Sequence, residues 1–169
     1  MQLLLVRHAH AGSPEEFAAT GRHDGERPLS RAGADKMRGV AHALHMQIPQ
    51  LDLIASSPYV RALETARILA EPYGLEVVEV PALIPDQPPA AVVDWLREQS
   101  AEAVAVVGHE PALGTLASYL LAGAARPFIT FKKAGACLIE HPGAPAPGTG
   151  TLIWSLTGGQ LRKLPHGSD

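Results

Sequence analysis

The sequence opens with Met1-Gln2-Leu3-Leu4-Leu5-Val6-Arg7-His8-Ala9-His10-Ala11-Gly12, and the predicted fold is organised around this stretch. Residues 3–6 form an uninterrupted apolar run, which is typical of a strand buried on both faces of a parallel sheet. The run stops at Arg7 and His8 and is followed by small residues. Open α/β sheets bind ligands at the carboxyl ends of their strands, so we expect these two side chains to begin a functional site.

The composition indicates one globular domain over residues 1–169. The chain is 46% hydrophobic and 18% charged, and its length suffices for one core of ordinary size. A formal net charge of -3 argues against non-specific binding to nucleic acids or anionic membranes, and no apolar window approaches the roughly 20 residues of a membrane span. The single cysteine, Cys137, excludes an intramolecular disulfide and fits a reducing compartment. We therefore expect a cytoplasmic protein.

Short apolar runs alternate with amphipathic segments along the chain, which is typical of a parallel sheet covered by helices. We predict parallel strands over residues 3–6, 51–55, 75–80 and 103–107, and a late antiparallel pair over residues 136–140 and 151–156. We predict helices that begin at Ser30, near residue 59, near residue 90 and at Pro111. Ser57 is expected to cap the second of these helices, with Pro58 in its first position. The expected fold class is a three-layer α/β/α sandwich with a mostly parallel, mixed sheet.

Three of the predicted strands lead into residues that suit one kind of ligand. Arg7 and His8 follow the first strand, Arg61 lies in the first turn of the helix after the second, and His109 follows residues 103–107. The carboxyl ends of parallel strands lie along one edge of a sheet, so these residues are expected to converge. Guanidinium groups match phosphate oxygens, and histidine can act as a nucleophile or a charged donor near neutral pH. The four side chains therefore predict a site for a phosphoryl group.

Three segments carry a resemblance to a known family. They are Leu-Leu-Leu-Val-Arg-His-Ala (3–9), Ser-Ser-Pro-Tyr-Val-Arg-Ala-Leu-Glu-Thr-Ala (56–66) and Val-Val-Gly-His-Glu-Pro (106–111). In order and spacing they resemble the signature segments of the histidine phosphatase superfamily, whose fold is phosphoglycerate-mutase-like. The short chain and Arg27-Pro28-Leu29-Ser30 resemble most its short phosphohistidine phosphatases, the SixA type.

The resemblance implies a role for each of these residues. His8 is implied to attack phosphorus and to carry the phosphoryl group transiently, while Arg7, Arg61 and His109 hold the phosphoryl oxygens. Arg27 matches a further arginine near the rim of the family's pocket. A covalent intermediate divides hydrolysis into two displacements, and fixed cations stabilise the charge on the oxygens. His8 must be neutral to attack, so we expect its other ring nitrogen to meet a backbone carbonyl and the arginines to disfavour the imidazolium.

The chain departs from the family at two places. Ala9 replaces the usual glycine, so the turn either needs no positive φ or is shifted. The larger esterases of the family have a glutamate proton donor after the third strand, where this chain has Pro81-Ala82-Leu83-Ile84-Pro85-Asp86. Asp86 is an offset substitute, and whether it or His109 protonates the leaving group stays open. An alkoxide needs such a donor more than an imidazole does, so we expect the substrate to be phosphohistidine on a protein. We expect the hydrolysis to need no metal ion and no other cofactor.

Two other functions stay open. A phosphatase or mutase for a small phosphate ester would be favoured if Asp86 is a working acid, and a non-catalytic module would bind phosphate or a phosphoprotein without turnover. Metal and cysteine chemistry have less support. Leu113 stands where a zincin has its second histidine, and no arginine follows Cys137 at the position that a phosphate loop requires. The sequence also contains neither a P-loop nor a dinucleotide-binding motif.

Overall fold

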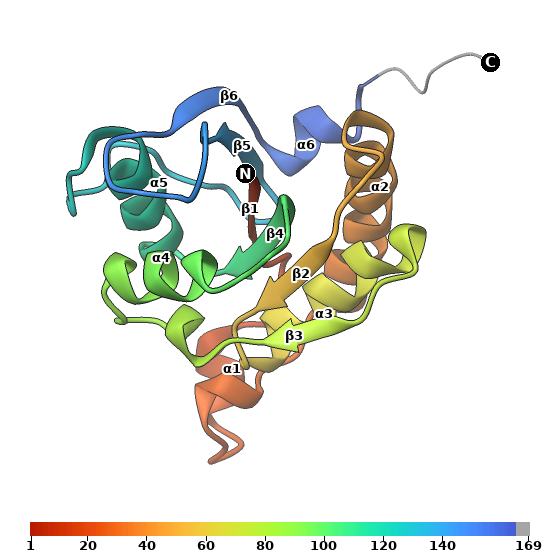
Figure 1. Cartoon of the computed structure of the whole chain (residues 1–169). Coiled ribbons are helices and arrows are strands. Elements are labelled where there is room, and N and C mark those ends of the chain that lie inside the picture. Colours follow the sequence, from red (N-terminus) through yellow and green to blue (C-terminus); the bar gives the residue numbers. More distant parts are fainter. Residues whose placement is uncertain (165–169) are drawn as a thin grey trace.

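The computed structural model describes residues 1–164, in which one six-stranded sheet lies between two layers of helices (Figure 1). The strand order is β3-β2-β4-β1-β5-β6. The strands are β1 (Gln2–Arg7), β2 (Leu53–Ser56), β3 (Val77–Glu79), β4 (Ala103–Gly108), β5 (Ala136–Glu140) and β6 (Thr151–Leu156). β1 to β4 pair in parallel, whereas β5 and β6 are antiparallel to their neighbours. The predicted mostly parallel, mixed sheet is confirmed.

The helices cover both faces of the sheet. One face is covered by α2 (Arg31–Gln47), α3 (Val60–Ala70) and the short α6 (Gly158–Leu161), and the other by α4 (Pro89–Arg97) and α5 (Ala112–Ala122) (Figure 1). Three 3₁₀ turns join these elements: η1 (Asp24–Glu26), η2 (Glu71–Tyr73) and η3 (Pro81–Leu83). None of the described helices is long and apolar enough to cross a membrane. The three-layer sandwich is the predicted one.

β1 is apolar because it is enclosed on every side. It pairs with β4 along one edge and with β5 along the other, so all its backbone groups face a neighbour. Leu4 and Val6 pack under α2 and α3, while Leu3 and Leu5 pack under α4 and α5, and none of the four is exposed. Burying each such side chain stabilises the fold by roughly 2 kcal/mol. The strand can therefore present polar side chains only where it ends.

Helix α3 begins later than the sequence suggested, and Ser57, its expected N-cap, contacts His109 instead. The helix starts at Val60, after Tyr59, which makes no side-chain capping hydrogen bond. Ser57 donates its backbone N–H to Val107 O (3.0 Å), which extends the pairing of β2 with β4 by one residue. The sheet therefore fixes Ser57 and turns its hydroxyl toward His109. The prediction of Ser57 as the N-cap was wrong for this reason.

The segment between β1 and α2 projects beyond the sheet edge and contains one unpredicted helix, α1 (Pro14–Ala18) (Figure 1). None of its five residues is buried, so the segment has no apolar stripe from which a helix could be predicted. The base of the segment is closed by a bridge between Ala11 and Leu29. Ser30 N also donates to His10 O (2.9 Å), and the Ser30 hydroxyl caps α2 as predicted. The projection thus starts and ends beside His8.

Candidate active site

His8 directly follows β1 and is held by contacts on its backbone and its ring. Its N–H donates to Gly108 O (3.0 Å), and its Nδ1 lies 2.7 Å from Ala9 O. Because a carbonyl oxygen only accepts, Nδ1 carries the proton and Nε2 keeps a free lone pair. Burial, together with the nearby charges of Arg61 and Arg7, lowers the pKa of His8 to about 4, although the bond to Ala9 opposes the shift. The ring is therefore neutral near pH 7, as expected.

The turn after His8 forms without glycine. Ala9 N donates to Thr65 Oγ1 (3.0 Å), and that hydroxyl donates to Arg61 O (2.7 Å). Among described residues other than glycine, only Asp86 and Ala134 have a positive φ, so Ala9 does not adopt the conformation that favours glycine. Thr65 therefore joins the end of β1 to the first turn of α3. The sequence analysis did not single out this threonine.

His109 follows β4 and is 3% exposed. Its ring centroid lies 5.1 Å from that of His8, and its Nε2 lies 2.9 Å from Ser57 Oγ. Its Nδ1 is buried and has no hydrogen-bond partner within residues 1–164. Burial, followed by the proximity of His8 and Arg61, lowers the pKa of His109 to about 3. The fold thus brings the two predicted histidines together.

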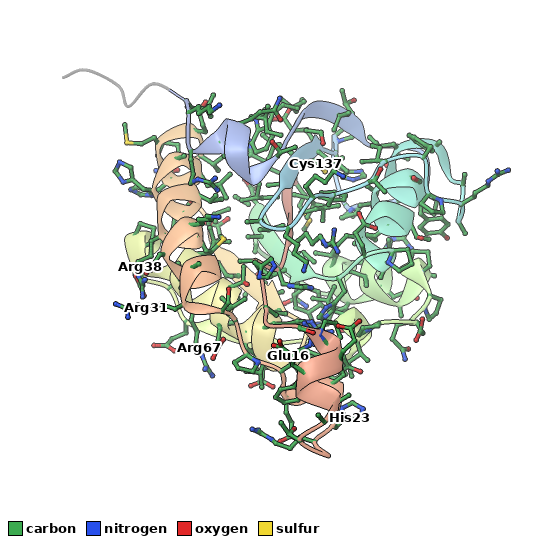
Figure 2. The ribbon with its side chains drawn as sticks, turned by 180° about the vertical axis from the view of Figure 1, so that it is seen from behind. Glu16, His23, Arg31, Arg38, Arg67 and Cys137 are labelled. Carbon is green, nitrogen blue, oxygen red and sulfur yellow. The ribbon has the colours of Figure 1, made fainter. Side chains whose placement is uncertain are left out.

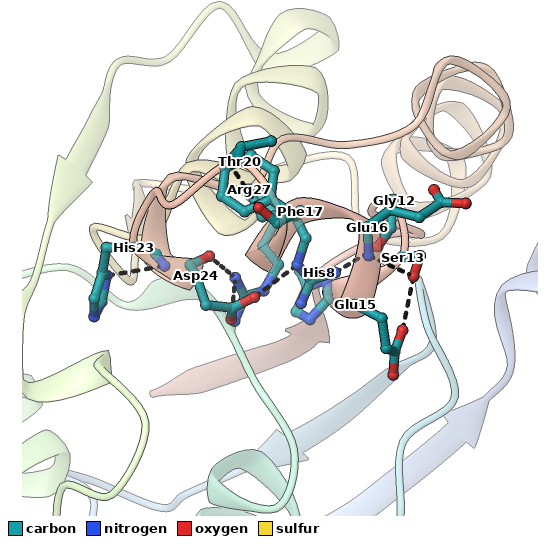
Figure 3. A network of polar contacts seen from close by, with 12 residues as sticks. His8, Gly12, Ser13, Glu15, Glu16, Phe17, Thr20, His23, Asp24 and Arg27 are labelled. Atoms are coloured by element: carbon teal, nitrogen blue, oxygen red, sulfur yellow. Dashed lines mark hydrogen bonds and ion pairs between the residues drawn. The ribbon is translucent and has the colours of Figure 1, made fainter.

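Arg61 and Arg27 share one carboxylate, which the sequence analysis did not identify. Asp24 Oδ1 accepts from Arg27 Nε (2.8 Å), and Asp24 Oδ2 lies 3.1 Å from Arg61 Nη1. Arg61 also donates to Asp24 O (2.8 Å), and Arg27 donates to Gly12 O (2.7 Å). Figure 3 shows Asp24 and Arg27 in the network of polar contacts on the projecting segment. The hydrogen bond from Arg27 lowers the pKa of Asp24, so its carboxylate is ionised beside both guanidinium groups.

This network brings Arg27 to the same carboxylate as Arg61. Both arginines are buried, with 7% of Arg27 and 6% of Arg61 exposed, whereas half of the Asp24 side chain is exposed. The Nε atom of Arg61 is buried and has no partner among the described residues. The spacing Asp-x-x-Arg before α2 was the available signal for Asp24, because residues three apart in a helical turn can pair.

Arg7 reaches the loop between α5 and β5. Its Nη1 donates to Phe131 O (2.6 Å), and its buried Nε has no partner within the described part of the chain. Glu110 Oε1 accepts from Phe131 N (2.5 Å), so this carboxylate holds the same loop. The loop also carries Lys133, whose charge contributes to lowering the pKa of His8.

Asp86 is not brought into the histidine pair by any described contact. It is exposed and has φ 72° in the turn that follows η3. Its neighbour Gln87, together with Leu83, lines a small cavity beside His109, and Asp86 does not line that cavity. Its role as an acid stays a prediction.

Cys137 lies in β5 and is fully buried, and burial raises the pKa of its thiol to about 12. Figure 2 shows it in the sheet, away from the projecting segment that carries Glu16 and His23. A thiolate nucleophile needs the opposite environment, with a lowered pKa and access to solvent. Within residues 1–164, no three His, Cys, Asp or Glu side chains form a group that could hold a metal ion.

Comparison with known proteins agrees with this geometry. The model of the histidine phosphatase superfamily (branch 1) matches residues 3–84, from β1 to the residue after η3. An uncharacterised protein of Picosynechococcus sp. (strain ATCC 27264 / PCC 7002 / PR-6) is 32% identical over 139 residues, which are 80% of this chain and 82% of that protein. The chain belongs to the histidine phosphatase superfamily. This membership makes it a phosphatase of the histidine type.

The relatives of this histidine phosphatase include short members of the superfamily. Phosphohistidine phosphatase SixA of Escherichia coli (strain K12) is 27% identical over 164 residues, covering 93% of this chain and 94% of the relative. The structure of the protein histidine phosphatase SixA complexed with tungstate has a TM-score of 0.81 at 24% identity, covering 95% of this chain and 99% of that one. The alpha-ribazole phosphatase of Shigella flexneri has a TM-score of 0.67 at 16% identity, covering 94% and 97%. The phosphoglycerate-mutase-like fold is therefore shared by phosphatases with different substrates.

Proposed function

We propose that this histidine phosphatase hydrolyses phosphohistidine on a protein, through a phosphorylated His8 and without a metal ion. The observation that carries the proposal is the state of His8: a buried, neutral imidazole whose Nδ1 is bonded to Ala9 O and which lies among arginine charges. A neutral ring with a free Nε2 is a nucleophile for phosphorus, and the surrounding cations attract the phosphoryl oxygens. The similarity to phosphohistidine phosphatase SixA supports the choice of substrate.

The proposed reaction has two displacements. His8 Nε2 attacks phosphorus and the bond from phosphorus to the substrate nitrogen breaks, while Arg7, Arg61 and Arg27 hold the oxygens. The departing imidazole takes a proton, for which we assign His109. The pKa of His109 is low in the free enzyme, but a phosphoryl dianion beside the ring favours its imidazolium form. Water then attacks phosphorus, the bond from phosphorus to His8 Nε2 breaks, His109 takes the proton that water loses, and free phosphate leaves.

The carboxylates around the site favour phosphohistidine over an ester. Asp24 is the carboxylate paired with the site arginines, and its lowered pKa keeps it ionised and unable to give a proton. Asp86 is exposed and does not line the cavity beside His109. An alkoxide leaving group depends on a strong proton donor more than an imidazole does, and no carboxylic acid in these contacts supplies one. The same reasoning makes a small phosphate ester the second choice of substrate.

The deciding experiment is a rapid-quench reaction in EDTA with a phosphohistidine peptide and, separately, with p-nitrophenyl phosphate. We expect acid-labile phosphate on the wild type and none on His8→Ala, with faster turnover of the peptide. His10→Ala is the matched control, because His10 is exposed two residues away and should keep the labelling. Turnover of the aryl ester alone would assign small esters as substrates. Saturable binding of phosphate without labelling or turnover would indicate a binding module.

A further inference from the structure

The loop between α5 and β5 places Lys133 between two attachments to the site. On one side of it, Phe131 O accepts from the Arg7 guanidinium (2.6 Å). On the other side, Ala134 N donates to His8 O (3.2 Å). The backbone of Lys133 is therefore fixed by its two flanks to the proposed nucleophile and to its neighbouring arginine. A four-carbon side chain from such a position can reach the surroundings of the proposed phosphoryl site.

The conformation of this loop is maintained by further contacts. Gly135 N donates to Lys132 O (2.8 Å), which closes a tight turn around Lys133. Ala134 has φ 57°, a left-handed conformation that costs an alanine about 1 kcal/mol and persists only where the surroundings impose it. Phe131 and Ala134 are buried, whereas Lys133 is exposed. The Lys133 side chain is therefore exposed to solvent, while the backbone of its turn is held by hydrogen bonds.

Lys133 has cations for neighbours. Burial lowers its pKa first, and Arg7, Arg27 and Arg61 lower it further. Within residues 1–164 it forms no ion pair with a carboxylate. By contrast, Arg27 and Arg61 are buried and share Asp24, and the half-buried Arg7 binds a backbone carbonyl. Lys133 is therefore the outer member of the group, on the solvent side, where the chain that carries a phosphohistidine would leave the site.

We propose that Lys133 is a specificity-determining residue that binds a carboxylate of the substrate next to the phosphohistidine, so that the enzyme prefers phosphohistidine in an acidic sequence. The inference rests on the proposed function, because it concerns the substrate of the same site. A cation that is fixed at its base and lacks an anionic partner discriminates between substrates by charge. An exposed pair of this kind contributes a preference of about threefold to fivefold, which falls as salt is added.

The test compares two phosphohistidine peptides that differ only in flanking Glu or Gln. The readout is the ratio of kcat/KM for the acidic peptide to that for the neutral peptide, at low and at high ionic strength. For the wild type we expect a ratio of about three to five at low salt. Lys133→Gln should bring the ratio to about one, and Lys133→Arg should preserve it. Lys132→Gln is the matched control, because this adjacent lysine is also exposed but lies outside the proposed contact.

The outcomes separate the inference from the proposed function. If both peptides are hydrolysed at equal rates by the wild type, the role of Lys133 is refuted while the proposed function stands. An unchanged ratio in Lys133→Gln, including equal slowing of both peptides, also refutes it. If neither peptide is hydrolysed although p-nitrophenyl phosphate is, the proposed function fails and the inference fails with it.

Discussion

At the scale of single residues, the proposed nucleophile His8 must be neutral to attack phosphorus. The pKa of its ring is lowered to about 4, chiefly by burial and then by Arg61 and Arg7. We predict that an NMR titration of the free enzyme shows His8 neutral down to about pH 4. The signal is assigned by its absence in His8→Gln. A midpoint near the ordinary value of 6.5 would contradict the burial argument.

The same shifts predict how stability depends on pH. His8 and His109 have pKa values of about 4 and 3 in the folded protein, both below the value of 6.5 in an unfolded chain. Between pH 6.5 and pH 4 the two histidines bind protons in the unfolded state but stay neutral in the folded state. The free energy of unfolding is therefore highest above pH 6.5 and falls as the pH is lowered through this range. Each histidine contributes a slope of about 1.4 kcal/mol per pH unit.

Urea denaturation from pH 7 to pH 5 measures this dependence. The free energy of unfolding of the wild type should fall more steeply with decreasing pH than that of His8→Gln. The difference in slope should approach about 1.4 kcal/mol per pH unit, which corresponds to one proton. Parallel curves for the two proteins would show that His8 titrates normally in the folded state.

At the scale of elements, the first turn of α2 packs so closely against the turn after β1 that only glycine fits at position 33. A Cβ at Gly33 would overlap His10 O, while a Cβ at Gly39, in the same helix, would meet only the flexible Arg162 side chain at 3.2 Å. Gly33→Ala should therefore destabilise the protein by about 1–3 kcal/mol and lower kcat, because the turn that follows His8 must move.

Gly39→Ala is the matched substitution, and it should stabilise the helix by about 0.5–1 kcal/mol through helix propensity. Thermal denaturation and steady-state turnover of both variants check the prediction. Equal effects of the two substitutions would mean that the contact between α2 and the turn does not matter.

The 3₁₀ turn η1 places an anion between two arginines of the proposed phosphoryl site. Asp24 is paired with Arg27 and Arg61, and its charge repels an incoming phosphate. Asp24→Asn keeps an acceptor oxygen for Arg27 and the backbone carbonyl that binds Arg61, but it removes the charge. Calorimetry with inorganic phosphate should give a Kd about twofold to fivefold lower than for the wild type.

Asp35→Asn is the control for this experiment, since that carboxylate pairs with Arg38 on the exposed face of α2. Figure 2 shows Arg38 on the outer flank of the helix layer. Weaker binding of phosphate by Asp24→Asn would mean that Asp24 matters more for holding the two guanidinium groups than for repelling phosphate.

At the scale of the whole molecule, one strand belongs to both hydrophobic layers. β1 packs Leu4 against one layer and Leu5 against the other, so neither layer is complete without it. The two tryptophans report on different layers, because Trp154 packs against the first and Trp95 against the second. We predict that the single-tryptophan variants Trp95→Phe and Trp154→Phe each unfold in one transition that coincides with the loss of secondary structure.

Coincident transitions, measured by fluorescence and circular dichroism in urea, would support the prediction of a single domain over residues 1–169. In each variant, the urea midpoint from tryptophan fluorescence is compared with the midpoint from circular dichroism. Midpoints that differ would show that the chain unfolds as two units.

The sequence by itself determined the sheet and the edge at which the site lies. Buried strands must be apolar along their length, so β1, β4 and β5 were predicted to within one or two residues at each end. Parallel strands end at a common edge, which is why Arg7, His8, Arg61 and His109 could be expected to converge. Both results follow from patterns that are local in the chain and imposed by burial.

Only the tertiary structure decided which polar partners meet at that edge. Ser57 lies against His109, Glu110 holds Phe131, and Asp24 joins two arginines. These partners come from loops that have no hydrophobic period, and their contacts depend on which segments the sheet brings side by side. A polar residue in a loop has many partners available to it in the unfolded chain, and the packing of the layers selects one of them.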